Sequence, residues 1–184
     1  MEVVIIVLAV IVIVPAIYVI ATYNTLVRYR NHVKESWSDI DTELKRRYDL
    51  IPNLVSTVKG YAMHEQSLLE ELTRLRGVCK ENNGDPAAQA DTENELQALL
   101  SKVLVRVEDY PELQANQNFL DLQDELTNTE DRIQAARRFY NGNVRDINSK
   151  IQMFPSNLVA GVFSFEESEF FELSSLSERN VPSA

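Results

Sequence analysis

The stretch VVIIVLAVIVIVPAIYVIA, residues 3–21, contains no charged side chain. As an α-helix with a rise of ~1.5 Å per residue it would be ~28 Å long, close to the thickness of the hydrocarbon core of a bilayer. Pro15 is compatible with this role because membrane helices tolerate proline. A cleaved signal peptide would need a basic start and a shorter apolar core, whereas the only charged residue before this stretch is Glu2. Residues 1–22 are therefore predicted to be an uncleaved transmembrane anchor.

Basic residues follow the predicted anchor and do not precede it. Arg28, Arg30 and Lys34 come shortly after residue 21, and no Lys or Arg lies before it. Basic residues mark the cytoplasmic side of a membrane helix. This asymmetry predicts a single-pass topology with the N-terminus outside and the rest of the chain in the cytoplasm.

Beyond the anchor, apolar residues recur at three- and four-residue spacing, which indicates helices. Four stripes are expected: Leu26, Val33, Trp37, Ile40 and Leu44; then Leu54, Val58, Tyr61, Glu65, Leu68, Leu72, Leu75 and Cys79; then Leu96, Leu99, Val103 and Val107; then Phe119, Leu122, Leu126, Ile133, Ala136, Tyr140, Val144, Ile147 and Ile151. KENNGDPAAQADT, residues 80–92, is predicted to be a loop, and only LVAGVFSF, residues 158–165, shows a weak strand-like alternation.

The four stripes can be buried only against one another, which predicts the fold class. The chain is expected to be all-α: a single transmembrane helix followed by an antiparallel, up-down four-helix bundle with long helices. The predicted domains are the anchor at 1–22, the helical bundle at 23–153, and an apolar, then acidic, C-terminal tail at 154–184.

The join between the first two predicted helices lies in RRYDLIPNLV, residues 46–55. Proline cannot donate a hydrogen bond inside a helix, but it is well tolerated in a first turn. We therefore expect a nearly loopless corner, with Asp49 as the N-cap, the second helix starting near Leu50, and Pro52 in its first turn.

Composition excludes several function classes. The net charge of -10 argues against nucleic-acid binding, because an acidic chain repels phosphate backbones. The single Cys79 cannot form an intrachain disulfide, and it is predicted to be a small, buried apolar residue. Five glycines and six prolines are too few for a turn-rich β protein.

The segment YAMHEQSL, residues 61–68, raises the question of a metal site. A zinc-hydrolase helix needs H-E-x-x-H, and the position four after His64 is Leu68. Carboxylate-bridged di-iron bundles need Glu-x-x-His, which does not occur in this sequence. Because Glu65 falls on the apolar stripe, we expect it to pair with Arg132 or Arg137 of another helix.

No phosphate-binding loop or nucleophile motif is found in the sequence either. The sequence therefore predicts no catalytic, metal or cofactor site, and a protein that is not an enzyme. The alternative is an enzyme, or a metal- or cofactor-binding module, that uses His64, Glu65 and the arginines of the fourth helix: Arg132, Arg137, Arg138 and Arg145.

The fourth predicted helix is unusually polar over LTNTEDRIQAARRFYNGNVRDINSKI, residues 126–151. One interpretation is a solvated face with intrahelical ion pairs, each worth a few tenths of a kcal/mol. The other is a hydrogen-bond network between helices, or a surface that meets another subunit. The sequence does not favour either interpretation.

Several motifs resemble the LemA family of bacterial membrane proteins. They are RRYDLIPNLV at 46–55, GYAxHE at 60–65, LTNTExRI at 126–133 and FYNxxV at 139–144, within a match that runs from about Thr22 to Phe165. The family's later tyrosine-asparagine pair is Ile147-Asn148 here. The resemblance implies a membrane-tethered, antiparallel, partly coiled-coil-like helical bundle at the cell envelope, without known catalytic activity. Some relatives are associated with magnetosome membranes.

These expectations define a working hypothesis: a scaffold or adaptor at the inner face of the bacterial plasma membrane. The expected partners are the lipid bilayer, further copies of the chain and an unidentified envelope protein. The apolar tail, FPSNLVAGVFSFEESEFF at 154–171, should return to the bilayer in an up-down bundle. Its acidic residues would be repelled by an anionic leaflet, so it is expected to pack on a neighbouring subunit.

Overall fold

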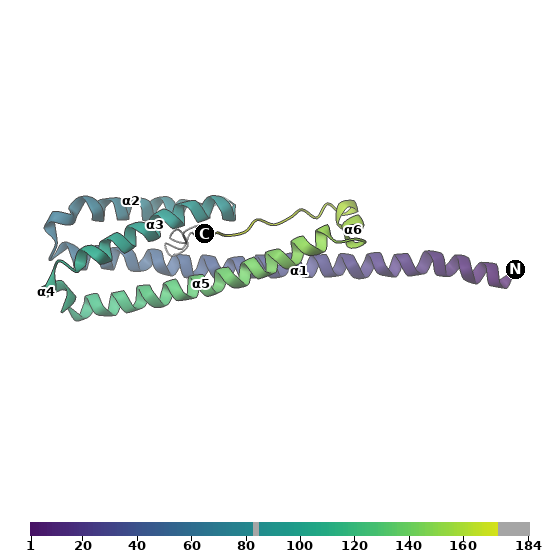
Figure 1. Ribbon diagram of the computed structural model, residues 1–184, viewed down its shortest axis with the longest axis horizontal. Helices are drawn as coiled ribbons and strands as arrows, with labels where there is room; N and C mark the ends of the chain where they lie inside the picture. The colour runs from purple at the N-terminus through teal and green to yellow at the C-terminus, as the bar shows by residue number, and fades with distance from the viewer. Residues whose placement is uncertain (83–84, 173–184) are drawn as a thin grey trace, which may run out of the picture. The chain divides into compact units, whose positions relative to one another are not determined.

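The computed structural model describes residues 1–82 and 85–172, and its regular elements are all helical in these ranges. They are α1 (Glu2–Lys59), the 3-10 helix η1 (Met63–Glu65), α2 (Gln66–Glu81), α3 (Pro86–Val107), α4 (Pro111–Gln114), α5 (Gln117–Gln152) and α6 (Ser156–Val162) (Figure 1). The all-α class is confirmed. The weak strand signal at 158–165 was wrong, because residues 156–162 form α6.

Helix α1 continues through Pro52, so the corner predicted at Asp49 and Leu50 is wrong. Proline in a helix interior leaves the carbonyl four residues earlier without its usual donor. That carbonyl belongs to Tyr48, and Arg76 of α2 donates its Nε–H to it over 2.5 Å. A side chain from another helix thus replaces the missing backbone hydrogen bond, and the helix does not need to end.

The chain turns instead at residues 60–62. The amides of Tyr61 and Ala62 both donate to the carbonyl of Val58, at 3.0 and 2.9 Å. The predicted second stripe is consequently split between α1 and α2, and Leu69 is buried in place of Leu68. Tyr61, expected on that stripe, is 42% exposed.

Helix α3 begins within the predicted loop, at Pro86. The Asp85 carboxylate accepts from the Ala88 amide at 2.7 Å, and Pro86 occupies the first turn. These are the favoured residues at these two positions, so the predicted loop was too long. The end of α3 before Pro111, and the extent of α5, match the expectations.

The described chain divides into two compact units. The first, called the anchor unit, comprises residues 1–37 and 139–168 and has a core of Leu26, Val159, Ala160 and Phe165. The second, the helical unit, comprises residues 38–138 and 169–184, of which 173–184, the end of the predicted tail, lie outside the described residues. Its buried residues include Leu44, Ile51, Leu72, Leu96 and Ile133.

Trp37 belongs to the anchor unit and is half-buried, although the stripe placed it in the core. Its ring packs on Tyr140, with centroids 5.4 Å apart. The neighbouring Ser36 is fully buried instead, and its hydroxyl donates to the carbonyls of His32 and Val33. The buried face of α1 is therefore centred on Ser36 here, one residue before the position that the apolar spacing predicted.

Candidate functional site

The most unusual feature of the helical unit is a group of charged and polar side chains in its interior, called here the buried polar cluster. It consists of Arg47 and Tyr48 from α1, Glu93 and Gln97 from α3, and Glu130 from α5. Arg47 and Glu93 are each only 1% exposed. Charged side chains are almost never buried this fully unless they are paired.

The members of the cluster bind one another. Arg47 contacts Glu93 through Nη2 and Glu130 through Nη1, the latter at 3.1 Å. The Tyr48 hydroxyl donates to the second oxygen of Glu93, and Gln97 donates to Glu130 over 2.9 Å. One guanidinium therefore bridges two carboxylates, and the cluster links α1, α3 and α5.

Burial and the Glu93 carboxylate raise the pKa of the Tyr48 hydroxyl, which stays protonated and can donate at neutral pH. Cys79 lies in the same region, and burial, reinforced by Glu93, raises the pKa of its thiol to about 12. Its Sγ lies 3.4 Å from the Thr92 carbonyl oxygen. Since the thiolate is the reactive form, Cys79 is an inert, buried residue, as predicted.

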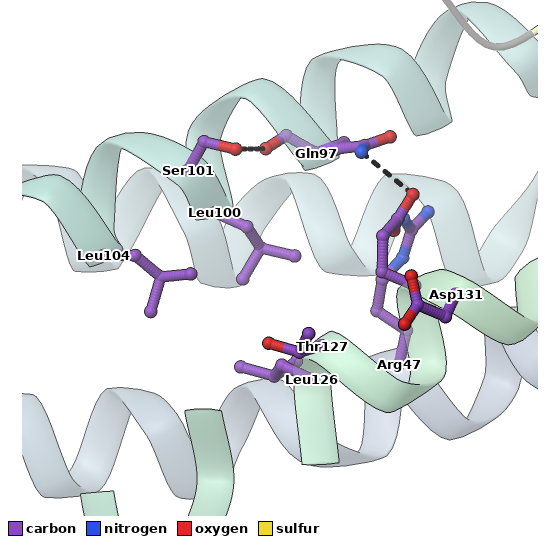
Figure 2. Close-up of a pocket in the computed structure, with 9 residues that line it drawn as sticks. Arg47, Gln97, Leu100, Ser101, Leu104, Leu126, Thr127 and Asp131 are labelled. Carbon is purple, nitrogen blue, oxygen red and sulfur yellow. Dashed lines mark hydrogen bonds and ion pairs between the residues drawn. The ribbon is translucent and has the colours of Figure 1, made fainter. Parts of the chain in front are cut away.

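A pocket opens beside the cluster (Figure 2). Leu100, Leu104 and Leu126 line its apolar part, and Arg47 and Gln97 lie at its polar end. Its volume is about 180 Å³, smaller than the ~300 Å³ at which small-molecule sites usually begin. The Arg47 Nε is buried without a partner among the described residues, while both terminal nitrogens are paired. The paired nitrogens of Arg47 link α1 to α3 and α5, which is a structural role.

The structure does not assemble the alternative site proposed around His64 and Glu65. Both residues lie in η1, with His64 exposed and Glu65 half-buried beside Val58, Val103 and other apolar side chains. No group of three potential metal ligands occurs among the residues that the structure describes.

The arginines of the predicted fourth helix lie elsewhere in α5. Arg132 lies 3.7 Å from Glu43 rather than beside Glu65, so that predicted pairing is wrong. Arg137 is half-buried, whereas Arg138 and Arg145 are exposed.

Some polar residues of α5 form hydrogen bonds to other segments, and others lie on a solvated face, so each of the two interpretations of this helix holds for part of it. In the anchor unit, Asn143 donates to the Ser36 hydroxyl over 3.1 Å and to the His32 carbonyl over 3.3 Å. Asn148 holds Ser168 by two bonds, donating to its carbonyl at 2.9 Å and accepting from its amide at 2.8 Å. Asn128 is exposed. The network between segments therefore exists, but only part of the polar surface contributes to it.

Sequence reasoning missed the central pair, Arg47 and Glu93. Both lie on apolar stripes at helical spacing: Arg47 between Leu44 and Ile51, and Glu93 three residues before Leu96. A charged residue on each of two stripes was the available signal. We used this signal for Glu65 instead. The stripe predicted to carry Glu65 is divided by the turn at residues 60–62, so its two parts belong to different helices.

Together, these features define an all-helical protein whose N-terminal helix is long and apolar enough to cross a membrane. The LemA family profile matches residues 36–184, more than half of the chain, and the chain belongs to the LemA family.

Individual relatives agree with this assignment. The chain is 26% identical to Protein LemA of Metamycoplasma hominis over 158 residues, covering 86% of this chain and 72% of that protein. It is 25% identical to Magnetosome protein MamQ 2 of Paramagnetospirillum magneticum over 175 residues, covering 82% of this chain and 64% of that relative. Magnetosome protein MamQ of Magnetospirillum gryphiswaldense is 22% identical over 174 residues, with 81% and 64% covered. The MamQ relatives are named as magnetosome proteins.

Proposed function

We propose that this chain is a single-pass membrane protein that acts by association, as a scaffold or adaptor at the bacterial cell envelope. The observation that carries the proposal is α1, which begins with an apolar stretch and continues without interruption to Lys59. The most apolar part of α1 is entirely exposed, whereas the core helix of a soluble protein would be covered. Val19, near the end of this stretch, packs against the core of the anchor unit, as expected for a segment that is retained.

In this proposal the N-terminus lies outside the plasma membrane and the rest of the chain lies in the cytoplasm. Arg28, Arg30 and Lys34 on the exit side of the apolar stretch support this orientation. The helices of residues 23–153 form an antiparallel, up-down bundle, supported by the tight turn at 60–62 and by the cluster that links α1, α3 and α5.

A role without catalysis is supported by how the charged groups are used. Arg47 is paired with both Glu93 and Glu130, the adjoining pocket is small, and His64 is exposed. The proposed activity is self-association and the binding of another envelope protein. Stoichiometric, tightly bound metal in the purified protein would contradict this part of the proposal.

Membrane anchoring is tested by alkaline extraction of membranes that contain the full-length protein. We expect the protein to remain in the membrane pellet. An arginine at the centre of a membrane helix costs about 2.5–3.5 kcal/mol in insertion, so Ile11→Arg should shift protein to the soluble fraction. Asp121→Arg, at an exposed position of α5, is the matched control and should behave like the unmodified chain.

Self-association is tested by producing two differently tagged full-length copies together and isolating one of them in detergent. We expect the second copy to be co-isolated when both are made in the same cells, and not when separately solubilised membranes are mixed briefly. Absence of the second copy from the co-produced sample would contradict self-association while leaving anchoring intact.

A further inference from the structure

The short helix α6 has one covered side and one apolar, exposed side. Its covered residues are Ser156, Val159 and Ala160. Leu158 and Val162 are four residues apart, and they are 61% and 78% exposed. These two residues are called here the exposed α6 face, and further exposed apolar residues adjoin α6 in the sequence: Met153, Phe154 and Phe163. Large apolar side chains gathered in this way mark a surface that is normally covered.

The position of α6 along α1 is defined by its contacts. Val159 and Ala160 pack with Leu26, and the centroid of the Phe163 ring lies 4.8 Å from that of the Tyr23 ring. At ~1.5 Å per residue, Tyr23 and Leu26 lie ~3 Å and ~8 Å beyond residue 21, where the apolar stretch ends. The headgroup layer on each side of a bilayer is ~5–8 Å thick. Helix α6 therefore lies beside the part of α1 that would cross the headgroup layer.

We propose that the exposed α6 face is embedded in the bilayer, at the boundary between headgroups and acyl chains of the leaflet from which α1 emerges. This inference rests on the membrane anchoring proposed above. The exposed α6 face adjoins an apolar surface already assigned to lipid, because Val19 of the apolar stretch packs against the same core as Val159. Interfacial helices bury their apolar side ~5–10 Å into this boundary, which agrees with the position of α6.

The charged groups nearby indicate which part of the lipid is bound. Arg28, the first charged residue after Glu2, and Arg30 are both exposed. The Arg30 guanidinium lies 5.2 Å from the centre of the Phe165 ring, close to the exposed Glu166 and Glu167. Acidic side chains are repelled by anionic headgroups. The occupant proposed is therefore the apolar boundary of the bilayer, in place of the neighbouring subunit expected from the sequence, and embedding should occur in zwitterionic phosphatidylcholine.

The test measures how deeply single tryptophans lie in phosphatidylcholine nanodiscs that carry the full-length protein. Trp37 is the chain's only tryptophan, so Trp37→Phe removes the background and retains an aromatic ring beside Tyr140. Leu158→Trp then reports on the exposed α6 face, Val12→Trp on the centre of the apolar stretch, and Val105→Trp on an exposed apolar position of the helical unit. Quenching is compared between lipids brominated near the headgroup and lipids brominated near the chain ends.

We expect Leu158→Trp to lose emission mainly with bromine near the headgroup, and its spectrum to shift to shorter wavelength on incorporation into nanodiscs. Val12→Trp should be quenched most by bromine near the chain ends, and Val105→Trp by neither lipid. Circular dichroism checks that each variant keeps the helicity of the unmodified chain.

The controls separate this inference from the proposal on which it rests. If Val12→Trp is quenched and Leu158→Trp is not, the inference is wrong and the anchoring stands. If Leu158→Trp is shielded both from brominated lipid and from aqueous acrylamide, a second protein chain covers the face, which also overturns the inference. If neither Val12→Trp nor Leu158→Trp is quenched, the anchoring itself fails.

Discussion

The helical unit buries charge, whereas the anchor unit exposes apolar side chains. In the helical unit, Arg47 and Glu93 are 1% exposed, yet each has partners of opposite charge or hydrogen-bonding capacity. In the anchor unit, Leu158 and Val162 are more than half exposed. Buried charges are rare in soluble proteins unless they are paired, and clustered exposed apolar side chains mark a surface that is normally covered. Charge can be buried where its partners are supplied by neighbouring helices, and apolar groups can remain exposed where lipid replaces water.

The largest effect is expected from removing the cation that pairs with the buried carboxylates of the helical unit. Arg47→Met should lower the free energy of unfolding by about 3–5 kcal/mol, because it leaves the Glu93 carboxylate buried beside Glu130 without a cation. Urea unfolding of the full-length protein in detergent, followed by circular dichroism, measures this loss.

The matched control is the adjacent Arg46. Its contact with Glu125 is made in solvent, with both side chains more than 40% exposed, so Arg46→Met should cost about 0–1 kcal/mol. In the Arg47→Met background, Glu93→Met should add much less destabilisation than it does alone, because the two groups interact directly. Equal losses for Arg46→Met and Arg47→Met would show that the buried pairing does not stabilise the helical unit.

A second prediction contrasts the two sides of the contact between α6 and α1. Leu26→Ala should destabilise the anchor unit by about 2–5 kcal/mol, because Leu26 is fully buried against Val159 and Ala160. Leu158→Ala, on the exposed α6 face, removes no buried contact within the protein and should destabilise the anchor unit much less than Leu26→Ala. Hydrogen exchange of the amides in 156–163 reports on this unit. A greater loss of protection in Leu158→Ala than in Leu26→Ala would reverse the assignment of the two sides.

A smaller effect on stability is expected from removing the Asn148 side-chain amide, which binds the backbone of Ser168 in the segment after α6. Asn148→Ala removes two hydrogen bonds to the backbone of Ser168 and should cost about 1–3 kcal/mol locally, because a partly buried amide and carbonyl lose their partner. Exchange at residues 165–170 should accelerate while the cluster around Arg47 is unchanged. The exposed Asn128→Ala serves as the control. Unchanged exchange at Ser168 would contradict the assignment.

The smallest expected effect on stability comes from the ionisation of the buried Cys79 thiol at high pH. Burial holds the Cys79 thiol protonated up to about pH 12, above the value of about 9 for a free thiol, and it also raises the pKa of Tyr48. The contribution of Cys79 to stability is therefore complete below pH 9 and lost as the pH rises toward 12. At pH 8, alkylation of Cys79 should be at least roughly tenfold slower in the folded protein than in urea. Equal rates would contradict its burial.

The sequence was most informative where a local rule acts alone. The all-α class and the extent of α5 follow from apolar spacing, and the burial of Cys79 follows from its place on a stripe. Asp85 and Pro86 carried a clear helix-start signal that the polar composition around them obscured.

The sequence was least informative where a distant residue changes the outcome. Pro52 can remain inside α1 because Arg76 donates to the Tyr48 carbonyl, a contact between residues 28 positions apart. The partners of Arg47 lie 46 and 83 positions away, so no local spacing could identify them. A buried glutamate paired with an arginine was the right kind of interaction, but it was assigned to Glu65 instead of Glu93.

The central claim, self-association in a membrane, is tested most directly by the mass of the chain in its lipid-bound form. Native mass spectrometry of the protein released from nanodiscs counts the chains in each particle against the chain mass of 21.0 kDa. The proposal predicts a defined multiple of this mass, stable to dilution. A mass of one chain at every concentration, from nanodiscs large enough to hold several, would contradict self-association and with it the proposed scaffold.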